Sequence, residues 1–596
     1  MGFNAKETEK EMPFYMQKNK WSIPDVIKDN FRFSTLSFIF IIFYVNVFQI
    51  LFGAENSIVG VIFTIMMSAS MVRDLTATPF RHLCIQAMVL IWMALAAFWV
   101  STLPAPLSFV INFITLSVIL YAFTYEYSSH IYFPYILSYL FLVFISPVNA
   151  QQLPKRMLGM AAGAVSIMLY QWIMGRKRVV ETARDVLTEM IDDICLLISH
   201  RMDETAEEPN PPGIHQKLCR LGRTVYERRK KVLCISDASF SMVAAGRGLE
   251  HLLLLVHELP DKLSEQETAI LAKTSDYLAS FRSFLHMETA ELPPIALPDF
   301  PAVQSEKTAR LFYNTLLYTQ DRLLHMTDPQ NKTHYRKTAI SLKVRIQAAL
   351  DLSPVRAIYA FRTALLLSCA TLLVQFLGLP HGRWLLFTLA SVSLPYADDV
   401  PSKMKKRIAA TIAGGILSVV IYSLIPSPAG RTAAMMLSGY LSFYFTDYRE
   451  TFTCSTIGAL GGAVFMNRFG FQAVGSMFLI RLGYIFVGAA AAYLANCVIF
   501  PYNRAKATRQ LWKKYRSVTE LLDRICLSDS MDTQLYYHLV IQAYLLEEKL
   551  SQNADLDAWE EFPALLTTYQ EKIRKAHRRL IAGRANAPVF EGGHLK

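Results

Sequence analysis

The sequence predicts an all-α, polytopic membrane protein with two repeated six-span helical bundles, each followed by a cytoplasmic helical domain. Three observations lead to this fold class. Of the 596 residues, 53% are hydrophobic, yet 18% are charged, and the two kinds are segregated along the chain. The apolar runs have about the 20 residues that a bilayer core requires. Corresponding residues also recur at a nearly constant offset, which indicates a duplication.

The repeat is carried by residue pairs that are 324 or 325 positions apart. Phe63-Thr64 corresponds to Phe387-Thr388, and Asp74 corresponds to Asp398, at an offset of 324. Arg156 and Gly163 correspond to Arg481 and Gly488 at an offset of 325. Parallel repeats are a known transporter plan in which binding sites lie at the interface between the repeats. We therefore expect two copies of one membrane unit.

The first 30 residues are polar and lack the apolar core of a signal peptide, so we expect a cytoplasmic N-terminal segment at 1–30. The first membrane unit follows at 31–175. Its expected spans are 33–52, 56–72, 83–100, 106–124, 131–148 and 155–174. The unit ends at the basic run 176–178, which is typical of a cytoplasmic boundary. An even number of spans then places both of its ends on the same side.

From 176 to 352 the apolar residues become periodic, as at 186–198, where they recur at intervals of three and four. This spacing predicts amphipathic helices in a cytoplasmic domain, with proline clusters separating them. The second membrane unit is expected at 353–501. Its expected spans are 356–378, 383–397, 407–425, 431–446, 451–467 and 473–500. A second cytoplasmic helical domain at 502–583 and a flexible tail at 584–596 complete the chain.

Composition excludes several function classes. The net charge of +12 is explained by Lys and Arg in cytoplasmic loops facing anionic lipid, so we expect membrane lipids and no nucleic acid as partners. The eight cysteines stand singly without a CxxC pair, and we expect neither a metal nor another cofactor. A GxxxxGK[ST] motif is absent from the sequence, so this chain has no P-loop for ATP. Nothing in the pattern specifies enzyme chemistry.

Several motifs in the second unit resemble those of a known family. They are Arg356 with Arg362, Arg383-Trp384 with Phe387-Thr388, Arg407 with Thr411 and Gly414, and Arg481 with Gly488 and Pro501. Their order and spacing resemble the fusaric acid resistance family, which is related to the aromatic acid exporters and more distantly to plant malate-transporting anion channels. The first unit departs from the pattern, with Arg81, Ile85 and Met88 where the second has Arg407, Thr411 and Gly414.

The resemblance implies an inner-membrane protein of two six-span units, each with a cytoplasmic domain, that exports aromatic or other organic acids. Among partners it leaves open a homodimer and, in a host with an outer membrane, a periplasmic adaptor. Together with the charge pattern it predicts a multi-pass protein whose two termini are cytoplasmic. Arg383, Arg431 and Arg468 fall on the opposite side in this arrangement and go against the positive-inside rule.

Three arginines are candidate substrate-binding residues. Arg156 and Arg481 occupy equivalent repeat positions within membrane segments, and Arg362 lies six residues inside the seventh span. A guanidinium in a membrane segment usually faces a protein interior or water, and it can bind a carboxylate through two parallel hydrogen bonds. The alternatives are a structural or snorkelled role for Arg156 and Arg481, and a salt bridge for Arg362.

Proton coupling would need a titratable group along the path. The spans contain almost no carboxylates, so the candidates lie at the ends of spans. They are Asp74, Asp398, Asp399, Glu126, Asp447 and Glu450. The alternative is that these residues pair with loop Lys or Arg and cap helices.

The sequence therefore predicts a secondary exporter of a small organic anion, such as an aromatic carboxylate, that works through a path between the two units. Two other classes stay open. One is a passive channel for such anions, and the other is a membrane scaffold that transports nothing. Flux with and without a pH difference separates them.

Overall fold

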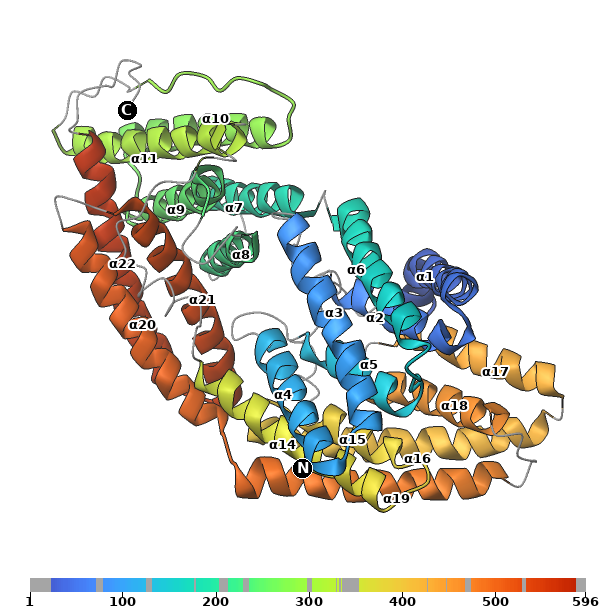
Figure 1. Cartoon of the computed structure of the whole chain (residues 1–596). Helices are drawn as coiled ribbons and strands as arrows, with labels where there is room; N and C mark the ends of the chain where they lie inside the picture. Colours follow the sequence, from blue (N-terminus) through green and yellow to red (C-terminus); the bar gives the residue numbers. More distant parts are fainter. Residues whose placement is uncertain are drawn as a thin grey trace, which may run out of the picture.

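The computed structural model describes residues 23–70, 79–124, 131–175, 178–202, 213–228, 235–296, 303–328, 330–331, 334, 353–425, 427–445, 447–466, 473–527 and 532–585. All regular secondary structure in these ranges is helical (Figure 1). The all-helical prediction is therefore confirmed for them. Asp74 and Glu126 lie outside the described residues.

The first group of helices covers the first predicted membrane unit. It consists of α1 (Ile23–Phe52), the 3-10 turn η3 (Ala54–Asn56), α2 (Ser57–Ser70), α3 (Pro79–Thr102), α4 (Ala105–Phe123), α5 (Tyr132–Phe144) and α6 (Leu153–Gly175). Each expected span coincides with one of these helices. Exposed Leu, Ile and Phe side chains on α1, such as Leu36, Phe43 and Ile50, are what a lipid-facing helix would show.

The second group covers the second predicted membrane unit. It consists of α14 (Pro354–Phe376), α15 (Arg383–Val392), η4 (Ala397–Asp399), α16 (Val400–Leu424), α17 (Pro428–Leu441), η5 (Ser442–Tyr444), α18 (Tyr448–Met466), α19 (Ala473–Tyr493) and the π-helix η6 (Leu494–Ile499). The basic run 403–407 begins between the expected spans 383–397 and 407–425 but is helical throughout. It lies inside the first two turns of α16, because Pro401 stands at a position where proline starts a helix readily.

Seven helical stretches in the described residues are long and apolar enough to cross a membrane. They are Ser34–Phe52, Pro79–Thr102, Ala105–Phe123, Asp237–His257, Pro354–Phe376, Ala397–Leu424 and Val474–Ile499. Six of them belong to the two groups above. The chain is accordingly a membrane protein with multiple apolar helices, and the arrangement as two six-span repeats stays a prediction.

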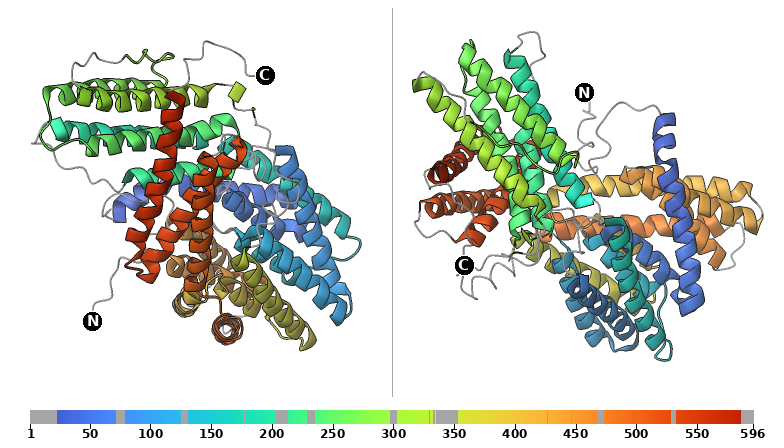
Figure 2. Two further views of the ribbon diagram at one scale, coloured as in Figure 1. Left: turned by 90° about the vertical axis from the view of Figure 1, so that its left-hand side faces the viewer. Right: turned by 90° about the horizontal axis from the view of Figure 1, so that it is seen from above.

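The remaining helices come from both polar segments of the chain. They are α7 (Arg178–Met202), α8 (Gly213–Arg228), α9 (Asp237–His257), α10 (Glu265–Leu285), α11 (Val303–Thr327), α20 (Arg504–Cys526), α21 (Thr533–Asp557) and α22 (Phe562–Ala585). Figures 1 and 2 show them gathered at one end of the molecule. They share one hydrophobic core, in which α8 packs against α21 and α11 against α22. We call these eight helices the joint bundle.

The joint bundle explains why α9 is as apolar as a membrane span. It contacts α7, α8 and α11, and nearly every residue from Asp237 to Val256 is buried. A helix that is apolar all round is either a membrane span or the centre of a protein core. Here the neighbouring helices cover it, so α9 is the central helix of the joint bundle.

The two membrane helix groups pack on each other through a common core. α4 packs along α14, α5 against α15, and α17 against α1. Within each group the sixth helix packs on the second at a glycine. A Cβ on Gly163 of α6 would overlap Phe63 of α2, and a Cβ on Gly488 of α19 would lie 3.1 Å from Thr388 Cβ of α15. The predicted repeat pairs the two glycines with each other, and the residues they meet belong to the corresponding dipeptides Phe63-Thr64 and Phe387-Thr388.

Candidate functional site

Arg481 of α19 is buried in the second helix group without a full set of partners. Its exposed fraction is 5%, and its Nε and Nη1 atoms are buried without a hydrogen bond. The guanidinium carbon lies 5.4 Å from the centroid of the Trp384 ring on α15, a cation–π contact. A buried guanidinium needs compensating partners, and an aromatic face supplies only part of that compensation.

Arg407 of α16 stands in the same situation. It is 5% exposed, and its Nε and Nη1 atoms also have no hydrogen-bond partner. Its guanidinium carbon lies 4.3 Å from the centroid of the Phe452 ring on α18, and Tyr448 of the same helix is close by. The helix of Arg407, α16, packs on α19, which carries Arg481, so the two buried arginines lie on neighbouring helices.

The local sequence explains why α16 buries this arginine. Arg407, Thr411, Gly414 and Ser418 follow one another at intervals of four, three and four, which places them on one face of the helix, and all four are buried. Thr411 Oγ1 donates to the backbone oxygen of Arg407 at 2.9 Å. A Cβ on Gly414 would lie 2.7 Å from the Thr453 carbonyl oxygen, so glycine is what lets α18 approach.

Helix α15, whose Trp384 contacts Arg481, is too short to cross a bilayer. α15 has 10 residues, which at the helical rise cover about 15 Å, against roughly 30 Å of hydrocarbon. After Val392 the backbone turns extended at Ser393, which is fully buried. Irregular backbone at membrane depth is tolerated only inside protein or around a water-filled cavity, and broken helices are typical of transporter sites.

Arg362 of α14 supports this break. Nη2 donates to the carbonyl oxygens of Leu394 at 2.5 Å and Pro395 at 3.3 Å, and Nη1 donates to that of Phe500 at 2.9 Å. These carbonyls follow the ends of α15 and η6, where helical partners run out. Arg362 therefore holds two interrupted chain segments together. The role that the sequence analysis gives it, in substrate binding, stays a prediction.

Arg156 of α6 forms its hydrogen bonds within the first helix group. It is 1% exposed and donates to the side chain of Asn56, to the carbonyl oxygens of Ser146 at 3.1 Å and Glu55 at 2.9 Å, and to Ser146 Oγ at 2.9 Å. Arg156 and Arg481 thus have different partners, although their repeat positions match. Helix α16, which packs on the Arg481 helix α19, carries Arg407, a residue that is not among the predicted substrate-binding residues.

The described proton-coupling candidates lie at helix ends. Asp398 accepts from the backbone N–H of Arg504 at 2.6 Å, and Asp399 forms an ion pair with the Arg504 side chain. Asp447 lies 3.6 Å from Lys406 Nζ and accepts from the backbone N–H of Arg449. Glu450 is an exposed residue in the first turn of α18. Asp398 and Asp399 connect the second helix group to the start of α20, and their coupling role stays a prediction.

The comparisons with known proteins fall on the same part of the chain. Residues 369–495 match the family described as fusaric acid resistance protein-like. This confirms the family resemblance for that segment. Trp384, Arg407, Phe452 and Arg481 all lie within this fusaric acid resistance-like segment, whereas Arg156 does not.

A curated relative extends the comparison. The chain is 26% identical over 146 residues to a protein named "Inner membrane protein YccS" from Escherichia coli (strain K12). The aligned part is 24% of this chain and 20% of the relative, so the match spans about a fifth of that protein. No solved structure matches the chain.

Proposed function

We propose that the protein is an inner-membrane secondary exporter of organic anions, and that Arg407 and Arg481 form the anion-binding part of its path. The observation that carries the proposal is the presence of two buried guanidinium groups on the packed helices α16 and α19, each with two nitrogen atoms that have no hydrogen-bond partner. Like charges buried in one helix group are costly, and a bound carboxylate would offset one of the two charges and supply hydrogen-bond acceptors.

The surroundings favour a carboxylate that carries an aromatic ring. A planar guanidinium recognises a carboxylate through parallel hydrogen bonds, and both arginines rest on aromatic rings, Trp384 and Phe452. These rings can also take the face or edge of an aromatic substrate. The broken helix α15 gives the site the irregular backbone that transporters use. The relative from Escherichia coli is named an inner membrane protein, which supports an inner-membrane location for this chain.

The path itself remains part of the proposal. Contacts of α4 with α14, α5 with α15 and α1 with α17 bring the two helix groups together, which supports a path at their interface. Both termini are proposed to be cytoplasmic. A homodimer and a periplasmic adaptor stay predictions.

The experiment is anion flux in proteoliposomes, with a panel of aromatic and aliphatic acids and with or without an imposed pH difference. We expect Arg407→Gln and Arg481→Gln each to lower the flux of the preferred acid at least tenfold, because a charge-assisted hydrogen bond contributes about 1.5–3 kcal/mol. Arg431→Gln is the matched control, since Arg431 of the same helix group donates to the carbonyl of Ile425.

The outcome separates the three function classes. A secondary exporter moves the anion uphill when a pH difference is imposed. A channel conducts down the gradient in both directions and ignores the pH difference. Flux that is absent for every acid, or unchanged in both variants, would contradict the proposed anion site and favour a scaffold.

A further inference from the structure

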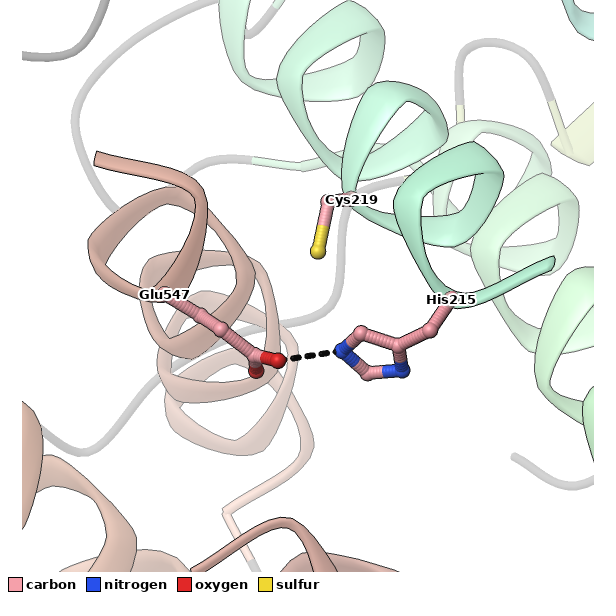
Figure 3. A group of neighbouring side chains, drawn as sticks. All are labelled: His215, Cys219 and Glu547. Atoms are coloured by element: carbon pink, nitrogen blue, oxygen red, sulfur yellow. Dashed lines mark ion pairs between the residues drawn. The ribbon is translucent and has the colours of Figure 1, made fainter. Parts of the chain in front are cut away.

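A cluster of three potential metal ligands lies in the joint bundle, well away from the arginine site. His215 and Cys219 stand four residues apart on α8, so they share one face of that helix. Glu547 of α21 faces them (Figure 3). The ligand atoms of the three residues all lie within 4.8 Å of one another. Cys219 and Glu547 are 4% and 2% exposed, so bulk water does not compete for them.

The imidazole of His215 is held with its Nε2 atom toward the cluster. Nδ1 lies 2.6 Å from Glu250 Oε1 on α9. Nε2 lies 2.5 Å from Glu547 Oε1, the ion pair drawn as a dashed line in Figure 3. The buried Nε2 atom makes no hydrogen bond of ordinary geometry. A carboxylate on one imidazole nitrogen and a metal on the other is the usual arrangement around metal-bound histidine.

The carboxylates are themselves held in place. Arg574 Nη2 of α22 lies 3.3 Å from Glu250 Oε1. Gln570 of the same helix donates to Glu547 Oε1, and the Tyr515 hydroxyl of α20 donates to Glu547 Oε2 at 3.4 Å. This support comes from the C-terminal helices, while His215 and Cys219 come from the segment between the membrane helix groups. The cluster thus joins two distant parts of the chain.

The set of donors selects the metal. One imidazole nitrogen, one thiolate and one carboxylate are the ligands that Zn²⁺ takes, in contrast to the all-oxygen sets of Mg²⁺ and Ca²⁺. We propose that His215 Nε2, Cys219 Sγ and the Glu547 carboxylate bind one Zn²⁺ ion that cross-links α8 to α21, with Glu250 orienting His215. A thiolate and a carboxylate neutralise the two positive charges of the ion.

Protons occupy these ligands when the metal is absent. Burial raises the pKa of the Cys219 thiol. Burial opposes protonation of His215, but Glu547 and Glu250 outweigh it and raise the pKa of His215 well above its usual range. Zn²⁺ takes Cys219 as a thiolate and His215 as a neutral imidazole, so the protons that these ligands carry pass to solvent on binding. The competing arrangement is a permanently protonated His215 between two carboxylates.

The test uses the full-length protein, purified in detergent with a tag that contains no histidine. We expect about one Zn²⁺ per chain by elemental analysis. After exchange for Co²⁺, we expect a near-ultraviolet thiolate-to-Co²⁺ absorption band. Cys219→Ser should abolish the band and weaken Zn²⁺ binding at least tenfold. Glu250→Gln should weaken it roughly 10- to 100-fold.

Cys195→Ser is the matched control, because Cys195 of α7 is half-buried against the same core and lies outside the cluster. It should bind Zn²⁺ and Co²⁺ as the unmodified protein does. The Co²⁺ band of the unmodified protein requires a thiolate ligand. This measurement therefore does not depend on whether the variants fold. A chain that takes up no stoichiometric Zn²⁺, or a Cys219→Ser variant that binds it unchanged, would overturn the proposal in favour of the protonated His215.

Discussion

Arg156 directs its donors to protein oxygen atoms and Arg362 leaves only Nε without a partner, whereas Arg407 and Arg481 each leave two buried nitrogen atoms without one. All four side chains are at most 5% exposed. Burial alone therefore does not distinguish a structural arginine from a candidate ligand-binding one. The distinction lies in the hydrogen bonds, and it leads to opposite expectations for stability.

We expect Arg156→Gln to lower the stability of the protein and Arg481→Gln to preserve or raise it. The first change removes several charge-assisted hydrogen bonds that tie α6 to η3 and to the end of α5, at a cost of about 3 kcal/mol. The second removes a buried charge that the protein does not compensate. Residues of a binding site often lower stability in this way, because they serve function. Apparent melting temperatures in detergent would test this, and a lower value for Arg481→Gln than for Arg156→Gln would contradict it.

The sequence predicts part of this residue-scale picture. Arg481 stands out because it interrupts an apolar run, and it does lie in the candidate site. Arg407 is harder to find, because it follows Lys403, Lys405 and Lys406 and so looks like a loop charge. The spacing of Arg407 with Thr411, Gly414 and Ser418 is the signal that it belongs to a buried helical face. The equivalence of Arg156 and Arg481 in the repeat does not extend to their partners.

At the scale of helices, two features shape the second group: interrupted segments and close contacts at glycine. α15 ends after 10 residues, and η6 closes the last helix with π-type turns. Arg362 binds carbonyl oxygens that follow both interruptions. The predicted spans locate these helices well, but no periodicity in the sequence reveals the break within 383–397, since the apolar run continues through it.

Close packing of α16 on its neighbours should be sensitive to a single methyl group. A Cβ on Gly414 would lie 2.7 Å from the Thr453 carbonyl oxygen, which cannot move without shifting α18. We expect Gly414→Ala to lower the free energy of unfolding by about 1–3 kcal/mol. Gly483→Ala on α19 is the control, because no atom lies within 4 Å of the added Cβ. Equal apparent melting temperatures for the two variants would contradict this packing.

The whole molecule combines two membrane helix groups with one joint bundle. The sequence predicts separate helical domains at 176–352 and 502–583. Amphipathic periodicity does predict the helices in both segments. It cannot reveal that they share a core, because each segment taken alone has apolar faces that any partner could cover. Long-range contacts such as the ion pair between Arg223 and Glu548 appear only in the folded chain.

The position of α9 leads to a topological prediction. Because α9 is a core helix, residues before and after it should lie on the same side of the membrane. In a chain without native cysteines, we expect Asp185→Cys on α7 and Asp261→Cys after α9 to react with a membrane-impermeant maleimide in inside-out vesicles. Both native side chains are exposed. Ser101→Cys, at the exposed C-terminal end of α3, should react only from the opposite side.

Labelling of Asp185→Cys and Asp261→Cys from opposite sides would mean that α9 crosses the membrane. The joint bundle could not then exist as described. Labelling of both sites from the same side would mean that α9 does not cross the membrane, although it is apolar enough to do so. Its burial comes mainly from α7, α8 and α11, and α21 adds Tyr536 and Tyr537, whose rings contact Phe240.

The shared core also has a consequence for biosynthesis. α9 leaves the ribosome long before α20, α21 and α22, because the whole second helix group is translated in between. At ordinary translation rates of about 5–20 residues per second, the delay is on the order of tens of seconds. During that interval α9 can pack on α7, α8 and α11, but it lacks its partners on α21, such as the Tyr536 hydroxyl that accepts from the buried Arg247. The helices of the first polar segment therefore have to keep α9 out of the bilayer until the C-terminal helices complete the core.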